Sequence, residues 1–156
     1  MNFSEIKPYV RYIQRFKITK PWAERYLIPR DNRLFFCLCG SGDITVGDRD
    51  CEMTRGSALL IPSGTPYILH IPESELTYIS VNFDYTLAHC DLTVPASPVS
   101  PEEFSANDII EHSAFSDEPM LNTYVYAKHI PSLEAYLSSM LSSYNKKLLY
   151  YENELS

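Results

Sequence analysis

Turn-forming residues interrupt the first 85 residues about every ten positions, and this spacing constrains the fold more than any other feature of the sequence. The segments between the turns are short and rich in β-branched, aromatic and other apolar residues. They predict strands over Tyr9–Ile18, Ala23–Ile28, Leu34–Leu38, Ile44–Val46, Cys51–Thr54, Ala58–Ile61, Tyr67–Ile71 and Leu76–Tyr85. About eight strands with this spacing predict a mainly β sandwich or barrel.

The turns between these segments have suitable residues. Gly40-Ser41-Gly42 permits a tight bend, because glycine adopts backbone conformations that other residues avoid. Gly47-Asp48-Arg49-Asp50 is typical of a hairpin loop. Residues 91–119 are richer in proline and predict an irregular connection, with one helical turn over Pro101–Phe104. One more strand is expected within Leu121–Ala127.

The periodicity changes at Pro131, which suits the first turn of a helix. Beyond it, apolar residues recur at steps of three or four, as on one face of a helix. They are Leu133, Leu137, Met140, Tyr144, Leu148, Tyr151 and Leu155. We expect one helix to end near Tyr144 and a second to begin near Lys146. The helical segment 131–156 is expected to belong to the same domain as the barrel, residues 1–130. Its apolar stripe fits packing on the barrel and packing on a second copy of the chain equally well.

The overall composition excludes some functions. Acidic residues outnumber basic ones by 20 to 13 and the formal charge is −7, so this chain lacks the basic face that binds nucleic acid. There is no apolar run of membrane-spanning length and no signal peptide at the N-terminus, which favours a cytoplasmic location. Cys37 and Cys39 would share one face of a strand, with Cys51 as a candidate neighbour, but their spacing suits buried apolar positions better than zinc ligands.

One motif identifies the type of barrel. In Gly56-Ser57-Ala58-Leu59-Leu60-Ile61-Pro62-Ser63-Gly64-Thr65-Pro66-Tyr67, the glycines and Pro62 have the spacing of the second cupin motif. The segment therefore resembles that motif, with Tyr67 in place of its histidine ligand. The resemblance implies a cupin (double-stranded β-helix, or jelly-roll) barrel followed by C-terminal α-helices, with residue 67 pointing into the barrel.

The metal ligands of a cupin are missing. If Gly40 ends the first cupin motif, Arg33 stands where its glutamate would be, and Tyr26–Pro29 contains no histidine. A cation site needs carboxylate or neutral imidazole ligands, and an arginine among them would repel the metal. We therefore expect no metal and no other cofactor.

A metal-free cupin followed by helices resembles the N-terminal ligand-binding and dimerisation domain of AraC-type bacterial transcriptional regulators. The resemblance covers about residues 8–85 and 131–156. It includes Tyr78–Asp84, with Asn82 in place of a histidine. It implies a sensor for a small polar metabolite, such as a sugar, that dimerises through Leu133, Leu137, Met140, Tyr144 and Leu148. DNA binding would belong to a C-terminal domain that this sequence does not contain, so we expect an excised sensor domain or, less favoured, a natural stand-alone version.

Alternation along the strands suggests which residues would contact a ligand. Tyr67 and Leu69 share a face. On the last strand either Tyr78, Ser80 and Asn82 or Ile79, Val81 and Phe83 point inward, and the resemblance favours the first set. Arg25 is the best anchor for a carboxylate, phosphate or sugar hydroxyl, although it could instead pair with an acidic residue at the barrel mouth. Trp22 could stack on a ligand. Arg11 and Phe36 are weaker candidates.

Two other functions remain open at this stage. One is a small metal-independent cupin enzyme, such as a sugar isomerase or epimerase, which would need an inward-facing acid–base pair. We expect no enzyme, because no inward histidine or carboxylate is evident. The other is a purely structural dimerisation module in which aromatic side chains fill the barrel.

Overall fold

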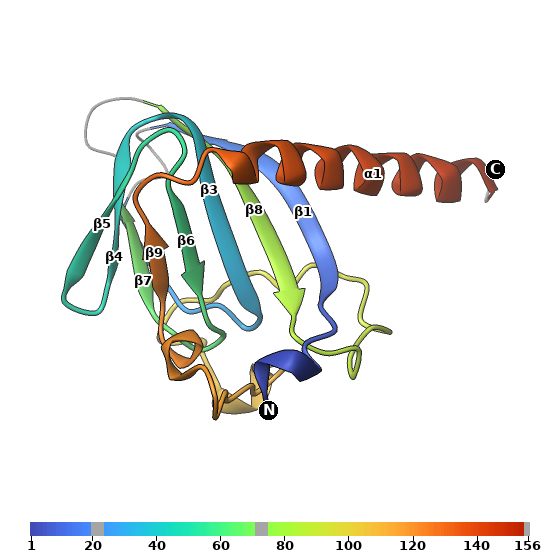
Figure 1. Ribbon diagram of the computed structural model, residues 1–156, viewed down its shortest axis with the longest axis horizontal. Coiled ribbons are helices and arrows are strands. Elements are labelled where there is room, and N and C mark those ends of the chain that lie inside the picture. The colour runs from blue at the N-terminus through green and yellow to red at the C-terminus, as the bar shows by residue number, and fades with distance from the viewer. Residues whose placement is uncertain (20–23, 71–74, 155–156) are drawn as a thin grey trace.

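The chain folds into two antiparallel sheets that face each other, with one helix packed on the outside (Figure 1). The computed structural model describes residues 1–19, 24–70 and 75–154, with side chains as far as residue 147. The larger sheet has the strand order β1-β8-β3-β6-β9, and the smaller sheet has the order β2-β7-β4-β5. Strands that are consecutive in sequence mostly lie in different sheets. This is the arrangement of a jelly-roll barrel, which confirms the predicted mainly β cupin fold with a helical C-terminal segment.

The strands match the predicted segments closely. They are β1 (Tyr9–Ile18), β2 (Arg25–Leu27), β3 (Asn32–Gly40), β4 (Gly42–Val46), β5 (Arg49–Met53), β6 (Ala58–Ile61), β7 (Tyr67–His70), β8 (Leu76–Asp84) and β9 (Val125–Ala127). The hairpin between β4 and β5 is tighter than predicted, because Val46 already pairs with Arg49. Within the described residues, short 3₁₀ helices complete the loops at η1 (Phe3–Glu5), η3 (Ala106–Asp108) and η4 (Pro119–Asn122). Residues 101–103 form a single turn, with the Glu103 amide donating to the Ser100 carbonyl at 3.1 Å, where one helical turn was expected over Pro101–Phe104.

The motif glycines are needed for the local backbone. Gly56 has φ +88° and Gly64 has φ +77°, in the left-handed region that favours glycine. A Cβ atom on Gly56 would lie 2.9 Å from Nδ1 of His129, so this position also lacks space for a side chain. Between these glycines β6 crosses the barrel wall, as the motif predicted.

Cys37 and Cys39 do not share a face, contrary to prediction. The pairing of β3 with β8 shifts register between these two residues, and a bulge of this kind breaks the strict alternation of a strand. Cys37 is buried between the sheets, whereas Cys39 is exposed. All four cysteines are free thiols.

A single helix, α1 (Ser132–Glu154), crosses the outer face of the larger sheet and continues beyond the edge of β1 (Figure 1). The predicted break near Asn145 is therefore wrong. Asparagine in a helix interior costs less than about 1 kcal/mol relative to alanine, too little to end a helix that is otherwise favourable. No helix among the described residues has the length and apolarity needed to span a membrane.

The apolar stripe of α1 mostly covers its own barrel. Leu137 is 2% exposed within a cluster on the outer face of the larger sheet, and Leu133 and Tyr144 pack against this cluster. Met140, by contrast, is 38% exposed. The side chain of Leu148 lies outside the described residues. Packing on the barrel thus accounts for three of the five residues predicted to dimerise, and dimerisation itself stays a prediction.

Candidate ligand-binding site

A cavity of about 540 Å³ lies between the two sheets. Its volume is within the range of sites that bind small molecules, about 300–1,000 Å³. Most of its wall is apolar and comes from both sheets: Phe16, Ile18, Leu27, Phe35, Ile44 and Leu69. Polar side chains interrupt this wall at a few positions. A mostly apolar cavity with a few directed polar groups is the usual design of a small-molecule site.

Six of the seven residues predicted to contact a ligand line this one cavity: Arg25, Tyr67, Leu69, Tyr78, Ser80 and Asn82. The seventh, Trp22, lies outside the described residues. The structure thus brings together residues from β2, β7 and β8 that are up to 57 positions apart in the sequence, from residue 25 to residue 82. Binding of a ligand by these residues stays a prediction.

Strand β8 turns its polar side chains inward. Tyr78, Ser80 and Asn82 line the cavity, whereas Ile79 and Val81 belong to the apolar cluster under α1. Of the two alternatives that the alternation left open, the polar set is therefore the inner one. The reason is that α1 covers the other side of the sheet and takes up the apolar set.

The two weaker candidates do not line the cavity. Phe36 is fully buried on the outer face of β3, in contact with the cluster under α1, because its neighbour Phe35 is the residue that points inward. Arg11 is 2% exposed and is used in a buried ionic network. The prediction that Arg11 and Phe36 face the cavity is therefore wrong.

An aromatic group forms the centre of the cavity wall. The ring of Phe35 lies 5.6 Å from that of Tyr67 and 5.5 Å from that of Tyr78, both in edge-to-face contact, and Phe16 stacks on Tyr78 at 5.6 Å. Burial raises the pKa of Tyr67, against a lowering by the nearby Arg33 guanidinium. Burial also raises the pKa of Tyr78. Both phenols are therefore neutral near pH 7 and can donate or accept hydrogen bonds.

Three positively charged side chains line the cavity: Lys17, Arg25 and Arg33. Arg25 lies on β2 and is exposed, as is Lys17, which pairs with Glu75 at 2.7 Å. Arg33 is different, because only 7% of it is exposed. Sequence reasoning noted Arg33 only as a substitute for a metal ligand and missed it as a lining residue. Its place in the cupin motif was a signal that it would point inward.

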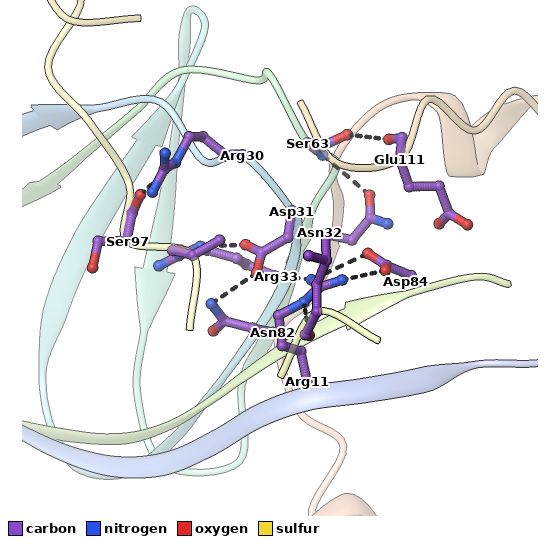
Figure 2. Close-up of polar contacts among 12 residues, drawn as sticks. Arg11, Arg30, Asp31, Asn32, Arg33, Ser63, Asn82, Asp84, Ser97 and Glu111 are labelled. Carbon is purple, nitrogen blue, oxygen red and sulfur yellow. Dashed lines mark hydrogen bonds and ion pairs between the residues drawn. The ribbon is translucent and has the colours of Figure 1, made fainter. Parts of the chain in front are cut away.

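A buried ionic network supports the end of the cavity where Arg33 lies (Figure 2). Arg11 donates to Asp31 at 3.4 Å and to both carboxylate oxygens of Asp84. Arg33 donates to Oδ1 of Asp31 at 3.2 Å. Asn82 donates at 3.0 Å to Oδ2 of Asp31, the oxygen that also accepts from Arg11. The network therefore joins β1, β3 and β8 and fixes the direction of the Arg33 side chain.

Charge balance keeps this network stable. Burial raises the pKa of Asp31, and Arg33, Asn82 and Arg11 lower it in turn. Burial raises the pKa of Asp84 as well, against the lowering by Arg11. Removing one partner of such a group would leave a charge buried and unpaired, which is strongly unfavourable.

The segment 92–99, which we call the strap, closes the same end of the barrel. Pro95, Ala96, Ser97 and Pro98 line the cavity, and Val99 forms a bridge with Ile28. Three arginines donate to backbone carbonyls of the strap: Arg11 to Leu92 at 3.0 Å, Arg30 to Ser97 at 3.1 Å, and Arg33 to Ala96. The composition of this segment predicted an irregular connection, but nothing in the sequence indicated its contact with the cavity.

Two of the cupin metal-ligand positions meet in space. Arg33, in place of the glutamate, lies beside Tyr67, in place of the histidine, and Arg33 also pairs in register with Asn82. These three side chains thus occupy one corner of the cavity. None of them is a carboxylate or an imidazole. Within the described residues, no three histidine, cysteine, aspartate or glutamate side chains come close enough to hold a metal ion.

The fold resembles several solved structures at low sequence identity. The EutQ protein of Clostridium difficile aligns with a TM-score of 0.42 at 15% identity, over 47% of this chain and 56% of that one. A cupin-2 domain protein of Shewanella frigidimarina aligns with a TM-score of 0.39 at 16% identity, over 55% and 83%. A variant of apo ToxT from Vibrio cholerae aligns with a TM-score of 0.45 at 8% identity, over 84% and 46%.

The chain thus spans about half the length of EutQ and ToxT. No protein-family model matches the sequence, and no curated protein matches it either. These similarities concern the fold alone.

Proposed function

We propose that this chain is the ligand-sensing and dimerisation domain of a transcriptional regulator of the AraC type, which binds a small molecule between its two sheets. One observation carries this proposal: a cavity of about 540 Å³ is lined by an apolar wall and by the polar side chains of Arg25, Arg33, Ser80 and Asn82. A barrel filled by its own aromatic side chains, as a purely structural module would be, leaves no such space.

A sensor function also needs a part that responds. The strap and the cavity share residues, and α1 packs on the outer face of the strand whose inner face lines the cavity. A ligand can change the position of these elements only if it binds one arrangement more tightly than another. We expect the response to be a change in the strap or in α1. DNA binding is assigned to a separate domain, since this chain carries a formal charge of −7.

The dimerisation part of the proposal concerns the exposed face of α1. Tyr136 is 73% and Met140 38% exposed, and residues four apart lie on one face of a helix. If α1 dimerises, we expect this face to form the contact. Sedimentation of the wild type and of Met140→Glu would test it, with a shift toward monomer as the expected result.

The cavity is poorly suited to catalysis. Its described lining contains no aspartate, glutamate or histidine, and the raised pKa values of Tyr67 and Tyr78 keep both phenols protonated near pH 7, so neither is ready to accept a proton. A sugar isomerase or epimerase needs a group that removes a proton. We therefore propose binding without turnover, in a cytoplasmic protein.

Thermal unfolding with a panel of sugars, sugar acids, carboxylic acids and phosphates tests the binding function. A ligand at one hundred times its Kd should stabilise the folded state by roughly 2.7 kcal/mol. We expect Arg25→Ala to weaken this effect. Arg15→Ala is the matched control, because Arg15 is exposed on β1 and does not line the cavity. No stabilisation by any compound would contradict the proposal.

A further inference from the structure

The charge of the cavity is opposite to that of the chain. The sequence has 20 acidic and 13 basic residues, yet the described cavity lining contains Lys17, Arg25 and Arg33 and no acidic residue. A cavity lined by one sign of charge attracts ligands of the other sign. Glu75, which pairs with Lys17, and Asp31, which pairs with Arg33, are not among the lining residues.

Arg33 is the best placed of these cations to select a ligand. It is almost fully buried, so a hydrogen bond that it makes to a ligand is poorly screened by water. Its direction is fixed by the bond from its Nε to Asp31. The planar guanidinium matches the two oxygens of a carboxylate better than it matches sugar hydroxyls.

The rest of the cavity suits an apolar body. Phe35, Ile44 and Leu69 contribute side chains from β3, β4 and β7. A ligand with hydroxyl groups along its whole length would lose hydrogen bonds to water against this wall. The combination of a buried cation at one end and an apolar wall indicates a ligand with one acidic group and an apolar remainder.

Arg33 also connects the cavity to the strap. Of the three arginines that donate to the strap, only Arg33 lines the cavity. Its Nη2 donates to the carbonyl of Ala96, which is itself a lining residue (the same corner is shown in Figure 2). A carboxylate accepts a stronger hydrogen bond from a guanidinium than a neutral carbonyl does. A carboxylate beside Arg33 would therefore compete with Ala96 for the same donor.

We propose that the ligand is an organic carboxylate with an apolar body, and that its carboxylate takes the hydrogen bond that Arg33 otherwise donates to Ala96. This inference rests on the proposed binding function and adds the ligand class and the first step of the response. The strap stays attached through Arg11 and Arg30, but its centre loses a contact. Ligand binding thereby loosens the strap around Ala96.

Calorimetric titration with matched probes tests the ligand class. The probes are octanoate and 4-phenylbutyrate, the primary amide of each, and D-glucose as a neutral polyol. We expect each carboxylate to bind at least tenfold more tightly than its amide. In Arg33→Gln we expect this difference to disappear.

Arg30→Gln is the matched control. It removes a bond to the strap at Ser97, but Arg30 does not line the cavity, so the preference for carboxylates should remain. Arg33→Lys keeps the positive charge beside Asp31. It replaces Arg33→Gln as the test variant if the glutamine variant does not fold. With lysine we expect a reduced preference, because the two-pronged geometry is lost.

Hydrogen exchange tests the response. With octanoate bound, the backbone amides of residues 96, 97 and 99 should exchange several times faster than in the unliganded protein, and octanamide should not produce this change. In Arg33→Gln these amides should exchange fast with or without octanoate.

The possible results separate the two proposals. If amides or glucose bind as tightly as carboxylates, the ligand class is wrong and the binding function stands. If carboxylates are preferred in Arg33→Gln as in the wild type, Arg33 is not the selecting residue. Slower or unchanged exchange in the strap would overturn the proposed response. If neither these probes nor the wider panel bind, the binding function fails as well.

Discussion

The two faces of the larger sheet are built for different purposes, although the same strands form both. The outer face of β3 and β8 presents Phe36, Ile79 and Val81 to α1 and is closely packed. The inner face of the same strands presents Phe35, Ser80 and Asn82 to a cavity. The outer face therefore contributes mainly to stability. The inner face gives up part of its packing and gains space and polar groups for a ligand.

The largest expected effect on the free energy of unfolding concerns two adjacent phenylalanines, Phe35 and Phe36. Phe36→Ala should lower the free energy of unfolding by about 3–5 kcal/mol, because Phe36 is fully buried in the packed outer cluster. Phe35→Ala should cost about 1–2 kcal/mol less, because part of its ring already borders a cavity. Urea unfolding of both variants measures the difference. An equal or larger cost for Phe35→Ala would mean that the inner face is as tightly packed as the outer one.

The helix that covers the outer face gives the second test. Leu137→Ala should lower the free energy of unfolding by about 3 kcal/mol, because Leu137 is 2% exposed. Tyr136→Ala, one position away and 73% exposed, should change it by less than about 0.5 kcal/mol. Neither variant should alter ligand affinity if the outer face has no part in binding. A small effect of Leu137→Ala on urea unfolding would show that α1 adds little to the stability of the barrel.

The cysteines give the smallest effect. Cys37 and Cys51 lie in the core between the sheets, whereas Cys39 and Cys90 are exposed. Burial raises the pKa of Cys37 to about 11 and also raises that of Cys51. Because the thiolate is the reactive form, two thiols should react rapidly with Ellman's reagent at pH 8, and two should react only on unfolding.

The raised pKa of Cys37 makes the free energy of unfolding depend on pH in the alkaline range. The Cys37 thiol ionises near 9.0 in the unfolded chain and near 11 in the folded protein. Between these two values the unfolded chain loses the thiol proton, whereas the folded protein keeps it. The free energy of unfolding is therefore unaffected below pH 9 and should fall as the pH rises through 11. Cys37→Ala should reduce this fall in alkaline urea titrations. Rapid reaction of a third thiol at pH 8 would show that water reaches the core between the sheets.

Much of the fold followed from local signals. The strand segments from Tyr9 to Asp84 were predicted within a few residues, because turn residues end them and each strand is rich in apolar side chains. The motif from Gly56 to Tyr67 predicted that Tyr67 points inward. The helix break near Asn145 and the shared face of Cys37 and Cys39 were wrong, because a continuous helix and a bulge depend on packing and strand register.

The candidate site was only partly predictable. Tyr67 was found from the cupin motif, and Arg25 from alternation along its strand. The strap and the roles of Arg11 and Arg33 were not predicted. The hydrogen bonds from these arginines to the strap join residues as many as 81 positions apart. Contacts over such distances leave no periodic pattern in a sequence.

Local sequence patterns were enough to predict which segments are strands and where the helix begins, and to place an arginine and a tyrosine at cupin ligand positions. The inner face of β8, by contrast, followed from the packing of the whole domain. The sequence separates the polar set Tyr78, Ser80 and Asn82 from the apolar set Ile79, Val81 and Phe83, but nearly all of both sets is buried, so alternation alone does not tell which set faces the cavity. The decision came from the position of α1, because the sheet face that a helix covers must be apolar, and the polar side chains were left to the cavity.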